Sequence, residues 1–409
     1  MKKVFVLVAV ATLFAVSCKD DKKGEVLAPD QEKETLDETC TKAVEMVSVE
    51  NWQATADIIT QTGEAVQNVE FSSDVYTWLA NLAQSFVIEE GEVTVTTYDA
   101  SKAKGAFTVV NDTLYVAQSN DLTLAYTLAD GTACDATVNV SANGTKVLVD
   151  TDYAYDDEGN QTETIDSKTY VIVPKSAEAK LNAAGKSALG VKITTDLTLA
   201  GEVPQPSDKI SATAEITAGD YTLAVTRALY SPTEVGVAAS FKYGKTTVLA
   251  ADFSAKGKIV FDEETQDPDL MKTSGKVNAS IKLLDNVELK GDLDWDKVKV
   301  QVEKVNEANT EEVAKAVAAE LEKVVNLTLY IQKTAQAKLG FEAYKPVESA
   351  EFVVWSVMPV VRFEDGSQYQ LPEEFFSEDG FPKTIEAVKN LLAEIEATFA
   401  PKEDVEPEA

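Results

Sequence analysis

The chain has 409 residues, of which 69 are acidic and 37 are Lys or Arg, so its formal net charge is −32. Such a charge repels nucleic acid and anionic membrane surfaces. The chain has only two arginines, Arg227 and Arg362, whose planar guanidinium groups could bind a phosphate through two hydrogen bonds. The absence of histidine excludes Ser-His-Asp and Cys-His nucleophiles and histidine-ligated zinc.

The first residues have the pattern of a secretory signal. Two lysines precede an apolar run over residues 4–16, which is too short to cross a membrane and leads through small residues to Cys18. We predict a signal peptide over residues 1–17. A cysteine at the expected cleavage point resembles the lipobox of bacterial lipoproteins, although Ala15 stands where that family usually has Leu. The resemblance implies lipid attachment at Cys18; the alternative is an ordinary signal peptide with an incidental cysteine.

The segment after Cys18 is short and charged. Residues 19–24 cannot pack, and we predict a lipidated tether over residues 18–35. Acidic residues directly after the cysteine also resemble the surface-export signal of Bacteroidota-type outer-membrane lipoproteins, and the body resembles uncharacterised β-rich lipoproteins of that group. This resemblance implies a lipid-anchored protein of the outer membrane that faces the extracellular side.

Helical spacing of apolar residues predicts a helical N-terminal region over residues 36–88, with Val75, Trp78 and Leu82 on one stripe. Over residues 89–305 the apolar period becomes two, and turn signals recur at short intervals. This pattern predicts an antiparallel β domain with one buried face. Its last strand is predicted around Val298, Val300 and Val302, which alternate with polar residues.

After residue 305 helix and strand mix. In the predicted α+β region over residues 306–400, Thr310 can cap one helix and a second runs from about Thr384 to Phe399. Residues 401–409 are predicted to be a disordered acidic tail. The predicted fold class is α+β and mostly antiparallel β, as a sandwich or an open curved roll, with a helical N-terminal region and amphipathic C-terminal helices.

Cysteines and acidic residues supply the possible covalent and metal sites. Cys40 and Cys134 could form a disulfide in an oxidising compartment, or remain two separately buried thiols. Three aspartates at alternate positions, Asp292, Asp294 and Asp296, could provide oxygen ligands for Ca²⁺. The alternative interpretation is that they are solvent-exposed residues at the start of a strand. An acidic turn over residues 150–158 has the same two interpretations. No other cofactor is expected, because the sequence contains neither a P-loop nor a dinucleotide-binding glycine motif.

The sequence therefore favours a non-enzymatic surface lipoprotein that acts as a binding or structural module of the cell envelope. Its expected partners are the membrane, through the N-terminal lipid, and a lipid, a glycan or an envelope protein, but not nucleic acid. One alternative is a carrier of lipid or another hydrophobic ligand in the groove of a curved sheet, which requires an unfilled apolar surface. Another is a glycan-binding protein using Trp295, Tyr153 or Tyr155, or a glycoside hydrolase with two carboxylates.

Overall fold

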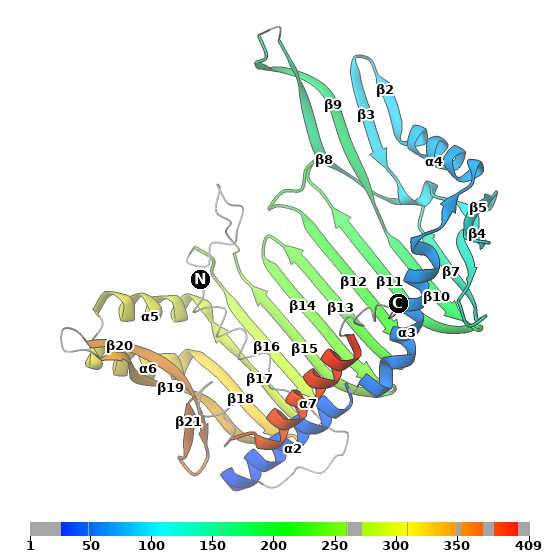
Figure 1. Ribbon diagram of the computed structural model, residues 1–409. Coiled ribbons are helices and arrows are strands. Elements are labelled where there is room, and N and C mark those ends of the chain that lie inside the picture. Colours follow the sequence, from blue (N-terminus) through cyan, green and yellow to red (C-terminus); the bar gives the residue numbers. More distant parts are fainter. Residues whose placement is uncertain are drawn as a thin grey trace, which may run out of the picture. The chain divides into compact units, whose positions relative to one another are not determined.

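The computed structural model describes residues 26–47, 49–156, 158–258, 260, 272–308, 310–348, 353–370 and 380–399. The chain forms two compact units: unit 1 combines residues 1–52 with 236–409, and unit 2 is residues 53–235. Figure 1 shows that strands dominate both units. The predicted class, α+β with mostly antiparallel strands, is confirmed.

Unit 1 is built on antiparallel strands that follow one another along the chain. From β15 to β21, each strand pairs with the next one. Tight turns join several of them, and Gln332 and Lys333, between the paired residues Ile331 and Thr334, adopt the positive φ angles of a two-residue hairpin turn. The strands are β14 (Glu234–Tyr243), β15 (Thr246–Lys256), β16 (Lys276–Leu283), β17 (Val287–Asp294), β18 (Val325–Ile331), β19 (Thr334–Glu348), β20 (Val353–Phe363) and β21 (Gln368–Gln370).

Helices cover the apolar face of this sheet. Near one end of the strands, Leu36 packs with Val287 and Ile331, and near the other end Leu321 packs with Phe341. The helices of unit 1 are α2 (Pro29–Glu45), α5 (Trp295–Ala308), α6 (Glu311–Val324) and α7 (Pro382–Phe399). Apolar side chains at the two ends of β17, β18 and β19 are therefore buried beneath α2 and α6.

Unit 2 contains a larger and a smaller sheet. In the larger sheet, β6, β7, β10, β11, β12 and β13 pair antiparallel in that order, and β4 joins β6 in parallel. Its strands are β1 (Glu70–Phe71), β4 (Gly105–Val110), β5 (Thr113–Ala117), β6 (Leu122–Thr127), β7 (Ala133–Val140), β10 (Ser176–Ala183), β11 (Lys186–Thr198), β12 (Lys209–Ala218) and β13 (Tyr221–Ser231). The smaller sheet has the order β2 (Val87–Glu90), β3 (Val93–Tyr98), β9 (Gln161–Pro174) and β8 (Gly144–Tyr155).

Two α-helices and one short 3₁₀ helix belong to this part of the chain: α3 (Val49–Gln67), α4 (Ser73–Phe86) and η1 (Ala100–Lys102). Ile58 and Ala65 of α3 pack on a cluster that includes Tyr126 and Leu181. The Thr62 and Tyr126 hydroxyl oxygens lie 2.8 Å apart in a hydrogen bond. This contact fixes α3 over one end of the strands of the larger sheet.

One predicted element is wrong. Val298, Val300 and Val302 were expected in a strand, but they lie in α5. The alternation is short and charged, and Val298 and Val305, one helical heptad apart, pack on α6 instead. Val300 and Val302 remain exposed. By contrast, the Thr310 cap is confirmed, because its hydroxyl accepts a hydrogen bond from the Val313 N–H at 3.4 Å.

Candidate functional site

Two neighbouring rows of apolar side chains cross one face of the larger sheet in unit 2. Residues opposite each other in antiparallel pairs share a face, so the register identifies both rows. The first row is Leu122, Val138, Ala179, Val191, Ile216 and Leu223. The second row is Val140, Ala177, Ile193, Ala214 and Val225. We call these two rows the apolar strip.

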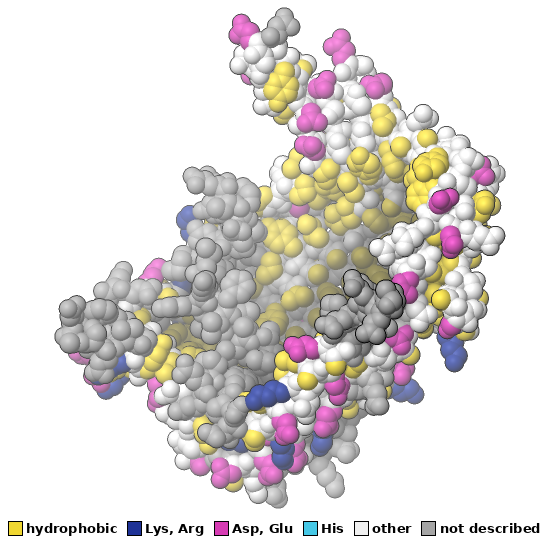
Figure 2. Space-filling model, viewed as in Figure 1, with side chains coloured by type: hydrophobic (Ala, Val, Ile, Leu, Met, Phe, Trp, Pro, Cys, Tyr) yellow, Lys and Arg dark blue, Asp and Glu magenta, His cyan; other side chains and the backbone are white. Residues whose placement is uncertain are grey.

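The apolar strip is open to solvent. Val138, Ile193, Ile216 and Leu223 are 36%, 40%, 41% and 48% exposed, and Figure 2 shows hydrophobic side chains gathered over β10 to β13. Single exposed apolar residues are ordinary, whereas a contiguous patch of several hundred Å² often marks a binding surface. With strands about 4.8 Å apart and same-face residues about 6.7 Å apart, the strip covers roughly 350 Å².

Ordered structure lies on both sides of the strip along the strands. On one side the next row, which includes Leu181 and Leu189, packs with α3. On the other side, Tyr230 donates a hydrogen bond to the Pro206 carbonyl at 2.7 Å. The loop there is held by Asp208, which is 1% exposed and accepts hydrogen bonds from two backbone N–H groups at 2.7 Å.

The chemistry of the strip suits hydrocarbon. None of its side chains carries a charge or a hydrogen-bonding atom, and the backbone groups of the inner strands are engaged in the sheet ladders. A polar ligand atom buried against the strip would lose its bonds to water without a replacement, which is costly. Apolar ligand surface meets no such penalty and gains from burial.

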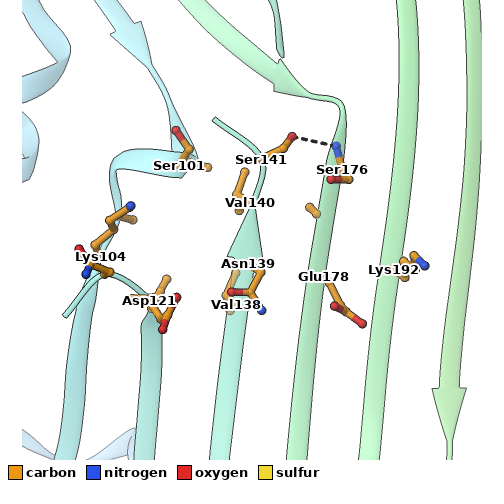
Figure 3. A pocket seen from close by; sticks show the side chains of 15 residues that line it. Ser101, Lys104, Asp121, Val138, Asn139, Val140, Ser141, Ser176, Glu178 and Lys192 are labelled. Atoms are coloured by element: carbon orange, nitrogen blue, oxygen red, sulfur yellow. Dashed lines mark hydrogen bonds between the residues drawn. The ribbon is translucent and has the colours of Figure 1, made fainter. Parts of the chain in front are cut away.

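A polar cavity of about 420 Å³ lies beside the same strands, and its lining includes four residues of the apolar strip, Leu122, Val138, Val140 and Ala177. Asn139, Glu178 and Lys192 are neighbours there by register, and Ser101, Lys104 and Asp121 line it as well. Figure 3 shows these side chains, which come from η1, from the residues just before β4 and β6, and from β7, β10 and β11. Glu178 pairs with Lys180 at 2.8 Å, and the hydrogen bond and charge of Lys180 lower the pKa of Glu178. A glycosidase acid needs a raised pKa, so this carboxyl is unsuited to that role.

The structure does not assemble the predicted calcium site. Asp294 forms an ion pair with Lys297 at 3.0 Å, whose hydrogen bond lowers the pKa of Asp294, and Asp296 pairs with Lys299 at 3.2 Å. Asp292 is exposed on β17. Within the described ranges, no group of three or more acidic or cysteine side chains is placed to hold a metal. Lysine partners therefore occupy the two carboxylates that were candidates as ligands.

The acidic turn between β8 and β9 is a hydrogen-bonded hairpin tip. The Asp156 carboxylate accepts hydrogen bonds from the backbone of Glu158 and Asn160 at 3.0 and 2.9 Å, and these bonds lower the pKa of Asp156. Asp157 lies outside the described residues. The turn thus has a structural explanation without a cation.

The three aromatic candidates for glycan contact are spread over different elements. Tyr153 and Tyr155 are exposed on β8, whereas Trp295 is half-buried at the first position of α5. Trp295 belongs to unit 1 and the two tyrosines belong to unit 2. Neither unit contributes all three to one surface, so glycan binding gains no support from this set.

Cys40 and Cys134 are free thiols in the structure, and the disulfide stays a prediction. Cys40 packs against the core cluster of unit 1, where burial and then Asp37 raise its pKa to about 12. Cys134 lies in the core cluster of unit 2, and burial raises its pKa as well. Both thiols are therefore protonated near neutral pH, which is unfavourable for a nucleophile.

Cys18, the predicted site of lipid attachment, lies outside the described residues. In the described part of the chain, no helix is both long enough and apolar enough to span a bilayer. Comparison with protein-family models, curated proteins and solved structures gave no match. The apolar strip was not among the predicted site residues; its alternation was visible in the sequence, but its exposure was not.

Proposed function

We propose that this protein is a non-enzymatic lipoprotein of the cell envelope, anchored to the outer membrane through Cys18 and facing outward, whose unit 2 binds a hydrophobic ligand on the apolar strip. The exposed, uncharged strip supports the binding role. The signal-like first residues and the cysteine at their end support the anchor. This proposal favours the hydrophobic-ligand alternative over a purely structural module.

The size of the strip is compatible with useful affinity. Removing roughly 350 Å² of apolar protein surface from water contributes about 9 kcal/mol at 25 cal/mol per Å². Association costs at least about 4 kcal/mol in lost freedom of motion. At most about 5 kcal/mol then remains, which corresponds to a Kd of about 0.2 mM at best before the ligand's own buried surface is counted.

Native mass spectrometry of the unacylated chain from residue 19, before and after organic extraction, tests ligand binding. We expect an extractable mass on the wild type that Ile216→Asp lowers, because the new carboxylate makes burial of apolar surface costly. Val300→Asp is the matched control, since Val300 is 42% exposed on α5 of unit 1. A clean mass for the wild type together with no binding of a hydrophobic fluorescent probe would refute the proposal.

The anchor has a separate test. In the source bacterium, we expect Cys18→Ser to abolish incorporation of labelled palmitate and to release the protein from membranes, because no thiol remains at the acylation point. Cys40→Ser is the control and leaves labelling unchanged. External protease added to intact cells should digest the wild type if the chain faces outward.

A further inference from the structure

One row of polar side chains lines the cavity that adjoins the apolar strip. Asn139 faces Glu178 in the pair of β7 with β10, and Glu178 faces Lys192 in the pair of β10 with β11. One further step of the register between β6 and β7 places Asp121 opposite Asn139, and one further step between β4 and β6 places Lys104 beside Asp121. All five residues line the cavity, and Figure 3 shows Asn139 between the other two pairs. We call these five residues the polar row.

The protein itself uses little of the hydrogen-bonding capacity of the polar row. Within the described ranges, Glu178 is the one member whose side chain has an ion-pair or hydrogen-bond partner, which is Lys180 at 2.8 Å. The hydrogen bond and charge of Lys180, followed by the charge of Lys192, lower the pKa of Glu178, so this carboxyl is ionised near neutral pH. The other four side chains of the row are available to a ligand.

The charges of the polar row compensate one another in adjacent pairs. Lys104 lies beside Asp121 and Lys192 faces Glu178, so each positive charge has a negative neighbour and the row has no net charge. An anion bound at either lysine would lie next to a carboxylate, and a cation bound at either carboxylate would lie next to a lysine. A ligand with a net charge therefore gains little along the row.

A hydroxyl group matches such a pair, because it both accepts and donates a hydrogen bond. It can accept from the lysine ammonium and donate to the neighbouring carboxylate, and both bonds are strengthened by the charged partner. The Asn139 amide offers a donor and an acceptor of its own between the two pairs. The row thus presents donors together with acceptors at three places, about 7 Å apart across the strands. The cavity volume of about 420 Å³ lies in the range of roughly 300–1,000 Å³ that is usual for small-molecule sites.

We propose that the polar row binds an uncharged carbohydrate, the class of ligand that carries several hydroxyl groups along its length. One hydroxyl bridges Lys104 and Asp121, another bridges Lys192 and Glu178, and Asn139 bonds the part between them. This is a second ligand site in unit 2. It adjoins the apolar strip, does not require a hydrophobic ligand there, and uses none of the three aromatic residues considered above.

A glycan array tests the ligand class. The unacylated chain that starts at residue 19 is applied to immobilised neutral oligosaccharides of glucose, galactose, mannose and N-acetylglucosamine, beside matched oligosaccharides of glucuronate and of glucosamine. We expect binding to at least one neutral oligosaccharide, and binding to its charged counterparts that is weaker by about tenfold or more, because a charged group meets a compensated pair. Equal or tighter binding of a charged counterpart, or no binding to any neutral member, would overturn the inference. Binding of a hydrophobic probe to the same protein tests the apolar strip separately.

Substitutions in the polar row test the location of the site by isothermal titration with the oligosaccharide that binds. Lys192→Met keeps the aliphatic stem and should weaken binding about tenfold or more, whereas Asn139→Ala, which removes an uncharged partner, should weaken it about two- to tenfold. Lys209→Met is the matched control, because Lys209 is exposed on β12 of the same unit and lies outside the cavity; it should leave the affinity within twofold. An unchanged affinity in Lys192→Met, or an equal loss in Lys209→Met, would place the carbohydrate elsewhere and overturn the inference. Circular dichroism confirms folding, and Lys104→Met replaces any variant that fails to fold.

Discussion

Ionisation of Glu32 is expected to make unit 1 less stable as the pH rises. Glu32 is in α2, is 1% exposed, and its Oε2 atom has no hydrogen-bond partner among the described residues. Burial, followed by the nearby charges of Asp365 and Glu364, raises the pKa of Glu32 to about 7. The native carboxyl therefore holds its proton at a pH where the unfolded chain has lost it.

The size of the effect follows from the difference between the two pKa values. The ordinary value is 4.5 and the native value is about 7, so the shift corresponds to about 3 kcal/mol. Between these values the native state binds one more proton than the unfolded state, and the free energy of unfolding falls as the pH rises. Below about pH 4.5 the cost is absent, and above about pH 7 it is complete.

Glu32→Gln removes the ionisation and keeps the shape of the side chain. We expect the variant to be more stable than the wild type by about 3 kcal/mol near pH 8 and nearly equal to it near pH 5. Urea unfolding at the two pH values measures the difference, and hydrogen exchange of the α2 amides assigns it to unit 1. Glu45→Gln, an exposed change at the end of α2, is the control. An equal stability difference between Glu32→Gln and the wild type at both pH values would refute the reasoning.

Two further predictions concern the backbone. Asp37 accepts hydrogen bonds from two backbone N–H groups at the start of α7, at 3.1 and 2.8 Å, so Asp37→Ala should destabilise that helix by about 1–2 kcal/mol, seen as faster exchange of its first amides. Exchange unchanged in α7 would count against this role. A Cβ on Gly291 would lie 1.6 Å from the Asn326 carbonyl oxygen, whereas at Gly63, in α3, it would meet nothing within 4 Å. Gly291→Ala should therefore unfold or markedly destabilise unit 1, and Gly63→Ala should stabilise its helix by about 0.5–1 kcal/mol in thermal unfolding.

The strands were predictable because alternation is a direct consequence of a sheet with one buried face. Val277, Ala279 and Ile281 alternate with polar residues, and they form β16 as that pattern requires. The capped helix at Thr310 was predictable for a comparable local reason. α5 was missed because three alternating valines fit the pattern of a strand. The spacing that indicates a helix is that of Val298 and Val305, and Val305 lies beyond the three valines.

The exposure of the apolar strip could not be predicted, because it depends on what lies above the sheet. Ile281 and Ile216 both sit in strands of alternating pattern, yet Ile281 is 1% exposed and Ile216 is 41% exposed. The row that joins Leu122 to Leu223 also depends on the pairing of β7 with β10, two strands separated along the chain by the hairpin of β8 and β9. The sequence pattern identifies which side chains lie on the same face of a strand. It identifies neither the order of strands that are distant in sequence nor which part of the sheet α3 covers.

The large negative charge and the exposed strip have to be considered together. An open apolar surface favours self-association, whereas a net charge of −32 makes copies of the chain repel one another. The strip itself is uncharged, so a neutral hydrocarbon ligand approaches it without electrostatic cost, while a second copy brings its whole acidic surface with it. The negative charge, which is unfavourable for nucleic-acid binding, therefore also favours a small, uncharged occupant over a protein one.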